Sequence, residues 1–478
     1  MTSSVLRLPV REILALYQLK KLSPVEVTQA CLKQILKYNP MLNAFALLDE
    51  KQALRQARGS EKRWMRGVQA GVLDGIPVTI KDWFHYKGWP TRYGSLASSG
   101  VVQHEDSPPV ARLREQGAVF LGKTTLPEYG HKGVTHSPFT GITRNPWNSA
   151  RTSGGSSGGA AVAAATGMGF LHLGSDAGGS VRIPASFSGV FGFKPSPGLA
   201  PSWPPSLFST LSAIGPLTRN VDDAALMLDV LTRPDARDWF ALPQGNGMFE
   251  RPDFSAALKK PLPKLRIAYA ATVNGFGPTP EVAQVLEKVR PALDVLGKVD
   301  EITLTAPHLV DVFNRHWSAV ASWSAAQFGA REKKKLDPRF LHWAAQGDAL
   351  PLHDYLDAER ARMSIGEYFK SLLETYDILV TPTTAMTAFE AGVDMPTLPS
   401  GKKQDDWTPF TFPANLARLP AASLPAGLCE NGLPAGLQVM GGYLKDALVL
   451  QVCKKLEELL GFTPWLLASS QDMPDGRA

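Results

Sequence analysis

Cysteine is scarce in this sequence, with three residues in a chain of 478. Cys31, Cys429 and Cys453 stand far apart, form no CxxC pair and have no cluster of histidines near them. A disulfide framework and a zinc site both require closer spacing of their ligands. We therefore expect buried free thiols in a reducing compartment, and no metal site.

The sequence also lacks a long hydrophobic run. No segment reaches the roughly 18 consecutive apolar residues of a membrane-spanning helix. The N-terminus has no basic start followed by an unbroken apolar stretch, so a signal peptide is not indicated. These absences predict a soluble, cytoplasmic protein with no membrane partner.

Basic residues are in excess but are not clustered. The formal net charge is +6, yet lysines and arginines are spread among acidic residues along the chain. The one clear basic run, Lys333 to Lys335, is typical of a solvated turn after a helix. A nucleic-acid footprint requires clustered charge, so we expect no nucleic-acid partner.

Glycine and proline are plentiful, with 42 and 38 residues, which indicates many loops over a regular scaffold. Residues 1–70 are predicted to be helical, because Ser23, Pro24 and Glu26 combine an N-cap, a first-turn proline and a capping box. From residue 75 onward, helix and strand patterns alternate, as in layered α/β domains. Helices are expected near 27–38, 49–58, 109–116, 158–166, 221–231, 280–296, 308–328 and 354–375, and strands near 75–80, 118–121, 170–173, 265–270 and 378–380.

Two glycine-serine clusters, at 154–159 and 174–180, flank a helix of small residues. Glycine lets backbone amides approach a substrate closely, and acyl transfer requires several amide donors aimed at one oxygen. A nucleophilic Ser180 would have such an oxyanion hole within its own loop. The N–H groups expected to form it belong to Ala177, Gly178, Gly179 and Ser180. The clusters therefore predict a serine-dependent enzyme.

The base that activates such a serine is less evident from the pattern. None of the nine histidines lies in a glycine-rich loop, and the nearest, His172, falls in an apolar strand that favours a packed, neutral ring. Lys81 is the better candidate, because it ends an apolar strand and burial can lower the pKa of a lysine toward neutrality. The alternative is an ordinary surface lysine paired with Asp82.

Two formal motif matches are misleading. Residues 117–124 fit the phosphate-loop expression GxxxxGK[ST], but their four middle residues are apolar and indicate a strand. Residues 155–159 fit the GxSxG nucleophile elbow, but no strand pattern precedes them. Neither nucleotide binding nor an α/β-hydrolase fold is expected.

Three spaced blocks carry a resemblance to a known family. Residues 75–82 (GIPVTIKD), 154–159 (GGSSGG) and 174–185 (GSDAGGSVRIPA) resemble the amidase signature family, and the similarity covers nearly the whole chain. The resemblance implies an α/β fold with a single large mixed β-sheet sandwiched between α-helices. It also implies an N-terminal helical segment, 1–70, before a catalytic domain, 71–478. Within that domain, the loosely matched and largely helical excursion 235–370 is expected to form part of the substrate pocket.

The resemblance implies a catalytic triad of Ser180, Ser156 and Lys81, which hydrolyses an amide through an acyl-enzyme and without a cofactor. Lys81 takes the proton of Ser156, which takes that of Ser180 as Ser180 attacks the amide carbon. Because members of the family hold the second serine in a cis peptide, one is expected at Gly155–Ser156.

Three residues near the nucleophile have other expected roles. Asp176 and Arg182 are expected to orient the loop rather than to react. Ala177 replaces a commoner threonine of the family, and since its role is that of a backbone donor, activity is expected to be retained.

Aromatic residues outside the three blocks favour an apolar or aryl amide as the small-molecule substrate. Most of them are expected to be core, and Tyr129 and Trp203 are the two expected to contact the substrate. The remaining candidates are Trp83, Phe84, Tyr93, Phe208, Trp317 and Trp323.

A second function stays open, that of the glutaminase (A) subunit of a tRNA-dependent amidotransferase, which passes ammonia to a partner. That function requires partner surfaces and a polar glutamine pocket. The apolar residues near Trp83 and Phe84, and the loose match through 310–350, argue against it. The sequence therefore favours a stand-alone amidase. A homodimer is an assembly that the family resemblance leaves open, and nothing in the sequence itself indicates one.

Overall fold

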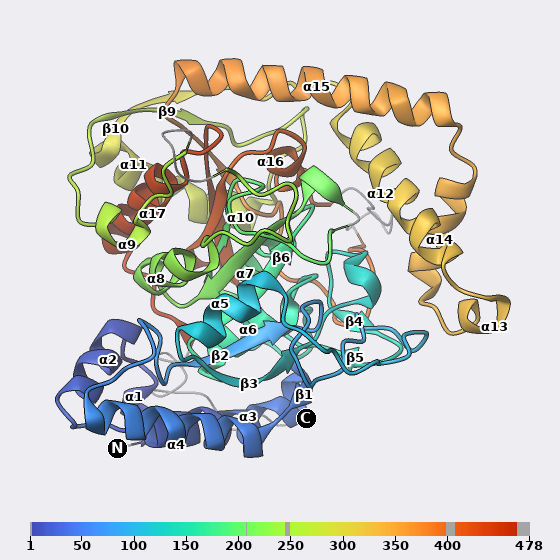
Figure 1. The fold of residues 1–478 in the computed structure, drawn as a ribbon. Helices are drawn as coiled ribbons and strands as arrows, with labels where there is room; N and C mark the ends of the chain where they lie inside the picture. Colours follow the sequence, from blue (N-terminus) through green and yellow to red (C-terminus); the bar gives the residue numbers. More distant parts are fainter. Residues whose placement is uncertain (1, 207, 244–248, 398–406, 466–478) are drawn as a thin grey trace.

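One mixed β-sheet of 11 strands runs through the described part of the molecule (Figure 1). The computed structural model describes residues 2–206, 208–243, 249–397 and 407–465. From one edge to the other, the strands are β1 (Phe45–Leu48), β3 (Val119–Thr124), β2 (Pro77–Lys81), β6 (Leu171–Asp176), β8 (Ala213–Thr218), β7 (Phe191–Lys194), β12 (Ala421–Leu428), β13 (Pro434–Gly441), β11 (Ile378–Pro382), β9 (Leu265–Tyr269) and β10 (Gly297–Glu301). A separate pair is formed by β4 (His136–Ser137) and β5 (Gly141–Ile142).

The sheet has two groups of parallel strands separated by an antiparallel middle, and its edge strand β1 pairs antiparallel with β3. Strands β3, β2 and β6 run parallel to one another, as do β11, β9 and β10. Neighbouring strands from β6 through β8, β7, β12 and β13 to β11 are antiparallel. Since the carboxyl ends of parallel strands lie at one edge of a sheet, residues that follow β2 and β6 are brought together.

Helices cover both faces of the sheet. On one face of β7, Phe191 and Phe193 belong to the same core cluster as Val221 of α8 and Val449 of α17. On the other face, Gly192 lies against Ala185 of α7, which a Cβ on Gly192 would contact. The helices are α1 (Thr2–Val5), α2 (Val10–Gln18), α3 (Pro24–Leu42), α4 (Glu50–Arg66), α5 (Pro108–Glu115), α6 (Gly158–Thr166), α7 (Arg182–Ser188), α8 (Val221–Leu231), α9 (Phe254–Ala257), α10 (Pro280–Glu287), α11 (Arg290–Leu296), α12 (Leu309–Ala326), α13 (Ala330–Lys333), α14 (Pro338–Asp348), α15 (Leu352–Thr375), α16 (Phe412–Leu416) and α17 (Asp446–Leu460), with short 3-10 turns at Glu128–Gly130 and Ser209–Leu211.

The N-terminal segment 1–70 is largely helical, as the sequence predicted. Its capping box is present, because the Ser23 hydroxyl accepts from Val25 and the Glu26 carboxylate accepts from the Ser23 N–H. The prediction of helix throughout is wrong at 45–48, where β1 forms an edge strand beside β3. So short an apolar run cannot be assigned to helix or strand from periodicity alone.

The excursion 235–370 is largely helical, although residues 244–248 lie outside the described residues. The single helix expected at 280–296 is two helices, α10 and α11. Pro291 lies in the first turn of α11, and proline lacks the N–H that a continuous helix would use there. Helices α12, α14 and α15 form the part of the molecule drawn at the right and top of Figure 1.

The misleading patterns of the sequence have structural explanations. The phosphate-loop expression falls on strand β3, whose Lys123 is buried and bonds to Asp82, so it is no phosphate loop. The basic run begins in the last turn of α13, and its three lysines are exposed. Among the described helices, none combines the length and apolar character that crossing a membrane requires.

Candidate active site

The two glycine-serine clusters meet at the end of strand β2. Lys81 is the last residue of β2, and Ser175 lies near the end of β6, its parallel neighbour in the sheet. The Lys81 side-chain nitrogen lies 2.7 Å from Ser156 Oγ, 3.0 Å from Ser157 Oγ and 3.0 Å from Ser175 Oγ. The structure therefore brings Lys81 and Ser156 together as the sequence predicted, and adds Ser157 and Ser175.

The environment of Lys81 favours its neutral form. Its side chain is 1% exposed, and burial lowers its pKa to about 7, an effect that the negative charge of Asp176 only partly opposes. The simpler interpretation, a surface lysine paired with Asp82, is wrong, because Asp82 is paired with Lys123 at 3.1 Å instead.

A neutral amine fits the three serines around it. It offers two N–H donors and one lone pair, whereas an ammonium offers three donors and no acceptor. The Ser157 hydroxyl donates to the Ser175 carbonyl at 3.2 Å, which leaves its oxygen to accept from Lys81. With Ser157 and Ser175 as acceptors, the lone pair of Lys81 is left for the proton of Ser156.

Ser156 is held between a cis peptide and a helix. The expected cis bond is present at Gly155–Ser156. Helix α6 begins two residues later, with Ser157 at its N-cap position. The N-terminal end of a helix carries partial positive charge, which disfavours a protonated lysine beside it.

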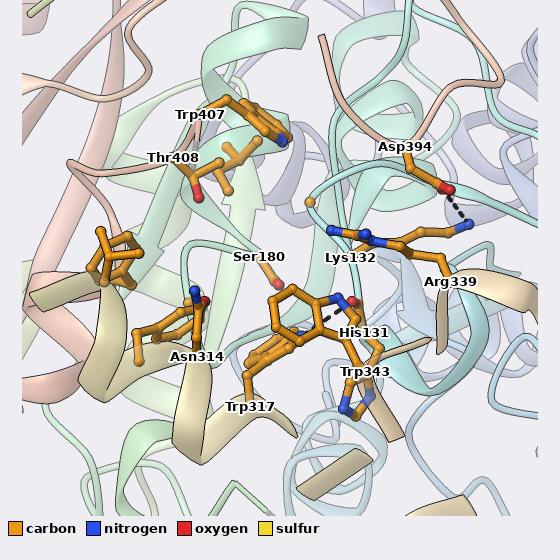
Figure 2. Close-up of a pocket in the computed structure, with 16 residues that line it drawn as sticks. His131, Lys132, Ser180, Asn314, Trp317, Arg339, Trp343, Asp394, Trp407 and Thr408 are labelled. Carbon is orange, nitrogen blue, oxygen red and sulfur yellow. Dashed lines mark hydrogen bonds and ion pairs between the residues drawn. The ribbon is translucent and has the colours of Figure 1, made fainter. Parts of the chain in front are cut away.

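Ser180 lines a pocket, and Figure 2 shows its side chain among the other lining residues. The side chain is nearly buried, and the hydroxyl makes no hydrogen bond to another described residue. The Ser180 carbonyl accepts from the Ser157 N–H at 3.0 Å, which ties the two clusters together.

Only part of the expected oxyanion hole has free donors. The Gly179 N–H donates to the Asp176 carboxylate at 2.8 Å, so we do not retain it as an oxyanion donor. The N–H groups of Ala177, Gly178 and Ser180 make no hydrogen bond within the described part of the chain. These three N–H groups remain candidate donors to an oxyanion.

Asp176 and Arg182 form a buried network beneath the loop. Arg182 donates two hydrogen bonds to the Asp176 carboxylate, at 3.0 and 2.9 Å. Burial alone would raise the pKa of the Asp176 carboxyl, but the Arg182 guanidinium holds that pKa well below its usual range. The remaining guanidinium donors reach the Thr411 carbonyl, Asn415 and Gln438 at 2.6 to 2.7 Å. The network therefore joins the loop of Ser180 to the C-terminal third of the chain.

An aromatic wall lines one side of the pocket. Phe313 and Trp317 of α12 and Phe412 of α16 contribute to the lining. Their rings stack in sequence, with centroids 5.1 Å apart between Trp317 and Phe313 and 4.7 Å apart between Phe313 and Phe412. Phe208 extends the stack at 4.6 Å from Trp317. Trp407 lies on the other side of Ser180 (Figure 2).

Polar groups occupy the rest of the lining. Figure 2 shows Asn314 and Thr408 to one side of Ser180, and Lys132, Arg339 and Asp394 to another. Lys132 bonds to Asp394 at 2.9 Å, and also to the carboxylate of Asp337. The pocket is therefore apolar on its aromatic wall and charged at one margin.

The two expected substrate contacts lie elsewhere. Tyr129 stacks on Tyr93 at 5.9 Å, and Trp203 packs edge-on against His85 at 6.0 Å. Neither is among the residues that line the pocket at Ser180, whereas Trp317, another aromatic residue noted in the sequence, is. Sequence reasoning missed Phe313, Trp343, Trp407 and Phe412, and the amphipathic pattern of α12 offered a signal for Phe313 alone.

His172 is a packed core residue, as its apolar strand predicted. It is fully buried, its Nδ1 lies 2.8 Å from Thr79 Oγ1, and burial lowers its pKa to about 3. No group of three potential metal ligands occurs among the described residues.

The chain matches the family model described as Amidase over residues 26–450. It is 35% identical to the glutamyl-tRNA(Gln) amidotransferase (A) subunit of Cyanothece sp. (strain PCC 7425 / ATCC 29141), over 93% of this chain and 96% of that protein. It is 32% identical to an acylamidase of Rhodococcus erythropolis, over 93% of each chain. Its fold matches the crystal structure of a bacterial aryl acylamidase of the amidase signature enzymes, with a TM-score of 0.88, 27% identity and coverage of 98% and 99% of the two chains.

Proposed function

Because this chain belongs to the amidase family, whose enzymes hydrolyse amide C–N bonds, we propose that Ser180, Ser156 and Lys81 are its catalytic triad and that an apolar or aryl amide is its substrate. The observation that carries the proposal is the buried amine of Lys81, 2.7 Å from Ser156 and surrounded by serines that suit its neutral form.

Acylation begins with proton transfer along the two serines. Ser180 Oγ attacks the amide carbon and gives its proton to Ser156, whose own proton passes to the lone pair of Lys81. The carbonyl oxygen becomes an oxyanion, stabilised by N–H groups of Ala177, Gly178 and Ser180. The proton then returns through Ser156 to the amide nitrogen, the C–N bond breaks, and the amine leaves.

Deacylation repeats the same steps with water. Lys81 and Ser156 remove a proton from a water molecule as its oxygen attacks the acyl carbon. A second oxyanion forms in the same loop, and the C–O bond to Ser180 breaks as the hydroxyl regains its proton. The carboxylic acid leaves and the resting enzyme is restored.

The aromatic wall supports an aryl or apolar group on the substrate. Flat rings at stacking distance offer a large apolar face to a planar group. The similarity to an acylamidase and to a bacterial aryl acylamidase agrees with this substrate class.

A second candidate is the glutaminase role in an amidotransferase, which the similarity to a glutamyl-tRNA(Gln) amidotransferase protein favours. The charged margin at Lys132, Arg339 and Asp394 offers groups that can bind an amino acid. The stacked aromatic wall beside Ser180 gives the stand-alone amidase first place.

A panel of amides tests the proposal. Acyl 4-nitroanilides, short aliphatic amides and glutamine are incubated with the enzyme and with its Ser180→Ala, Ser156→Ala and Lys81→Ala variants. We expect anilide cleavage that falls by at least about 1000-fold in Ser180→Ala. Turnover within a few-fold of the parent in Ser180→Ala or Lys81→Ala would refute the triad, and turnover of glutamine alone would move the glutaminase to first place.

A further inference from the structure

The loop that carries the nucleophile is held by a residue far along the chain. Thr411, directly before α16, is fully buried. Its hydroxyl donates to the carbonyl of Gly178 at 2.7 Å, although the two residues are 233 positions apart in sequence. Its own carbonyl accepts from Arg182 at 2.7 Å. Thr411 is thus fixed by the buried network and contacts the loop directly.

The bond from Thr411 completes the restraint of one peptide unit. A peptide unit is planar, so fixing its carbonyl and its N–H fixes its orientation. In the unit that joins Gly178 to Gly179, the carbonyl accepts from Thr411 and the N–H donates to Asp176 at 2.8 Å. This unit cannot rotate without losing both bonds.

A second peptide unit of the loop is restrained in the same way. In the unit that joins Ser180 to Val181, the carbonyl accepts from the Ser157 N–H at 3.0 Å, and the Val181 N–H donates to Asp176 at 3.1 Å. The loop is therefore held on both sides of Ser180. The Ser180 N–H, one of those left for an oxyanion, lies in the peptide unit between these two. The other two, of Ala177 and Gly178, lie in the peptide units before them.

Close packing keeps Thr411 in place against the loop. Gly179 has a φ of +125°, which L side chains rarely adopt, and a Cβ there would collide with the Thr411 side chain. The Thr411 hydroxyl has two acceptors within reach, Gly178 O at 2.7 Å and Thr408 O at 3.3 Å, and the shorter contact is the one to the loop.

We propose that Thr411 is a positioning residue for the oxyanion hole, an inference that rests on the proposed function of Ser180. By holding the Gly178 carbonyl away from the substrate, its hydroxyl keeps the neighbouring amides aimed at the oxyanion. Without that bond the Gly178–Gly179 unit keeps only the bond from the Gly179 N–H to Asp176, and a turn of its carbonyl toward the oxyanion would oppose the negative charge that the amides stabilise.

Two substitutions of Thr411 separate its hydroxyl from the rest of the side chain, and a third substitution, at Thr166, is the control. Thr411→Val keeps the shape and removes the donor, whereas Thr411→Ser keeps the donor. With an acyl 4-nitroanilide as substrate, we expect Thr411→Val to lower kcat by about 10- to 100-fold and to leave KM within about threefold of the parent. This decrease in kcat does not exceed the decrease caused by removing one oxyanion donor. Thr411→Ser retains most of the parent kcat. Thr166→Val is the matched control, since that buried hydroxyl also donates to a carbonyl, at 2.8 Å, but within α6.

A boronic acid that forms a tetrahedral adduct with Ser180 gives a readout that a merely structural role does not move. Its affinity should fall in Thr411→Val in proportion to kcat/KM, while Thr166→Val binds as the parent does. If Thr411→Val does not fold, Thr411→Cys is compared with Thr411→Ser, because a thiol is a weaker donor of similar size. The cysteine variant should then have the lower kcat.

Two results would overturn the proposal for Thr411 alone. One is a folded Thr411→Val enzyme with kcat within about threefold of the parent; the other is equal loss in the serine variant and in the variant without a hydroxyl. Turnover that survives Ser180→Ala would instead overturn the proposed function, and the role of Thr411 with it.

Discussion

At the residue scale, the same side chain takes three different roles in this molecule. Lys81, Lys123 and Lys194 are all fully buried or nearly so. Lys123 is paired with Asp82, and Lys194 donates to the Pro195 carbonyl. Of these three, Lys81 alone lies among serine hydroxyls at hydrogen-bond distance, whereas Lys123 contacts the Thr91 hydroxyl and is held by the Asp82 carboxylate.

The pH dependence of turnover tests Lys81 as the base. Burial lowers its pKa to about 7, and the proposed mechanism requires the neutral form. The logarithm of kcat/KM should therefore rise with a slope near one below about pH 7 and level off above it. The measurement uses two anilides of different leaving-group reactivity between pH 5 and 9.5, so that a chemistry-limited rate is recognised.

Two other buried groups titrate in the same range and supply controls. Burial lowers the pKa of Lys194 to about 7 and raises that of Glu128 to about 7. Lys194→Met and Glu128→Gln should both keep the midpoint of the profile. A flat profile in the parent enzyme, or a midpoint that moves with Lys194 or Glu128, would count against Lys81.

At the element scale, helix α12 places the aromatic wall. Phe313 and Trp317 are four residues apart on this helix, so their side chains lie on the same face. Phe412 comes from α16, the short helix whose preceding residue, Thr411, contacts the loop of Ser180 at Gly178. The aromatic wall and the restraint on the loop of Ser180 therefore both depend on α16 and the residue before it.

Replacing Phe313 tests the aromatic wall as the source of aryl preference. Phe313→Leu keeps an apolar side chain but loses the flat face and the stacking with Trp317 and Phe412. We expect the ratio of kcat/KM for an aryl amide to that for a short aliphatic amide to fall by about 3- to 10-fold. Trp323→Leu is the control, because Trp323 belongs to the same helix but is 55% exposed and does not line the pocket. An unchanged ratio in Phe313→Leu would place substrate selection elsewhere.

At the scale of the whole molecule, the N-terminal segment is part of the main sheet and core. Strand β1 pairs with β3, and the buried side chains of Val10, Ile13 and Tyr17 belong to the same core cluster as Val78 of β2. The Val10 N–H also donates to Asp223 at 2.9 Å, across 213 positions of sequence. The division at residue 70 thus marks a change of local structure within a continuous core.

Removing the N-terminal segment tests this continuity. A chain of residues 71–478 would expose the apolar surface that α2, α3 and β1 cover, so we expect it to aggregate or to lose its near-ultraviolet circular dichroism. The full chain with Val10→Pro, which cannot donate to Asp223, is a milder comparison and should unfold at a lower temperature. A truncated chain with the parent melting temperature and Ser180-dependent turnover would show that segment 1–70 is a separate unit.

Much of the fold and site could be predicted from local pattern. The capping box at Ser23 and the apolar strand before Lys81 depend on neighbours in sequence, and both are present in the structure. The glycine-serine clusters limited the candidates for the proposed nucleophile and its amide donors to a few residues. Local pattern missed the strand at 45–48, which is too short to show a period. It also missed the break near residue 288, where the expected helix is interrupted before Pro291.

The sequence by itself determined the family, the class of fold and the serines and lysine of the proposed triad, because these rest on short motifs whose residues are close together. Only the tertiary structure decided which aromatic residues reach the pocket. It also decided that Gly179 donates to Asp176 and that Thr411 contacts Gly178. These outcomes depend on contacts between segments up to 233 positions apart, which no local pattern encodes. Such contacts arise because β6 and the C-terminal strands belong to one sheet.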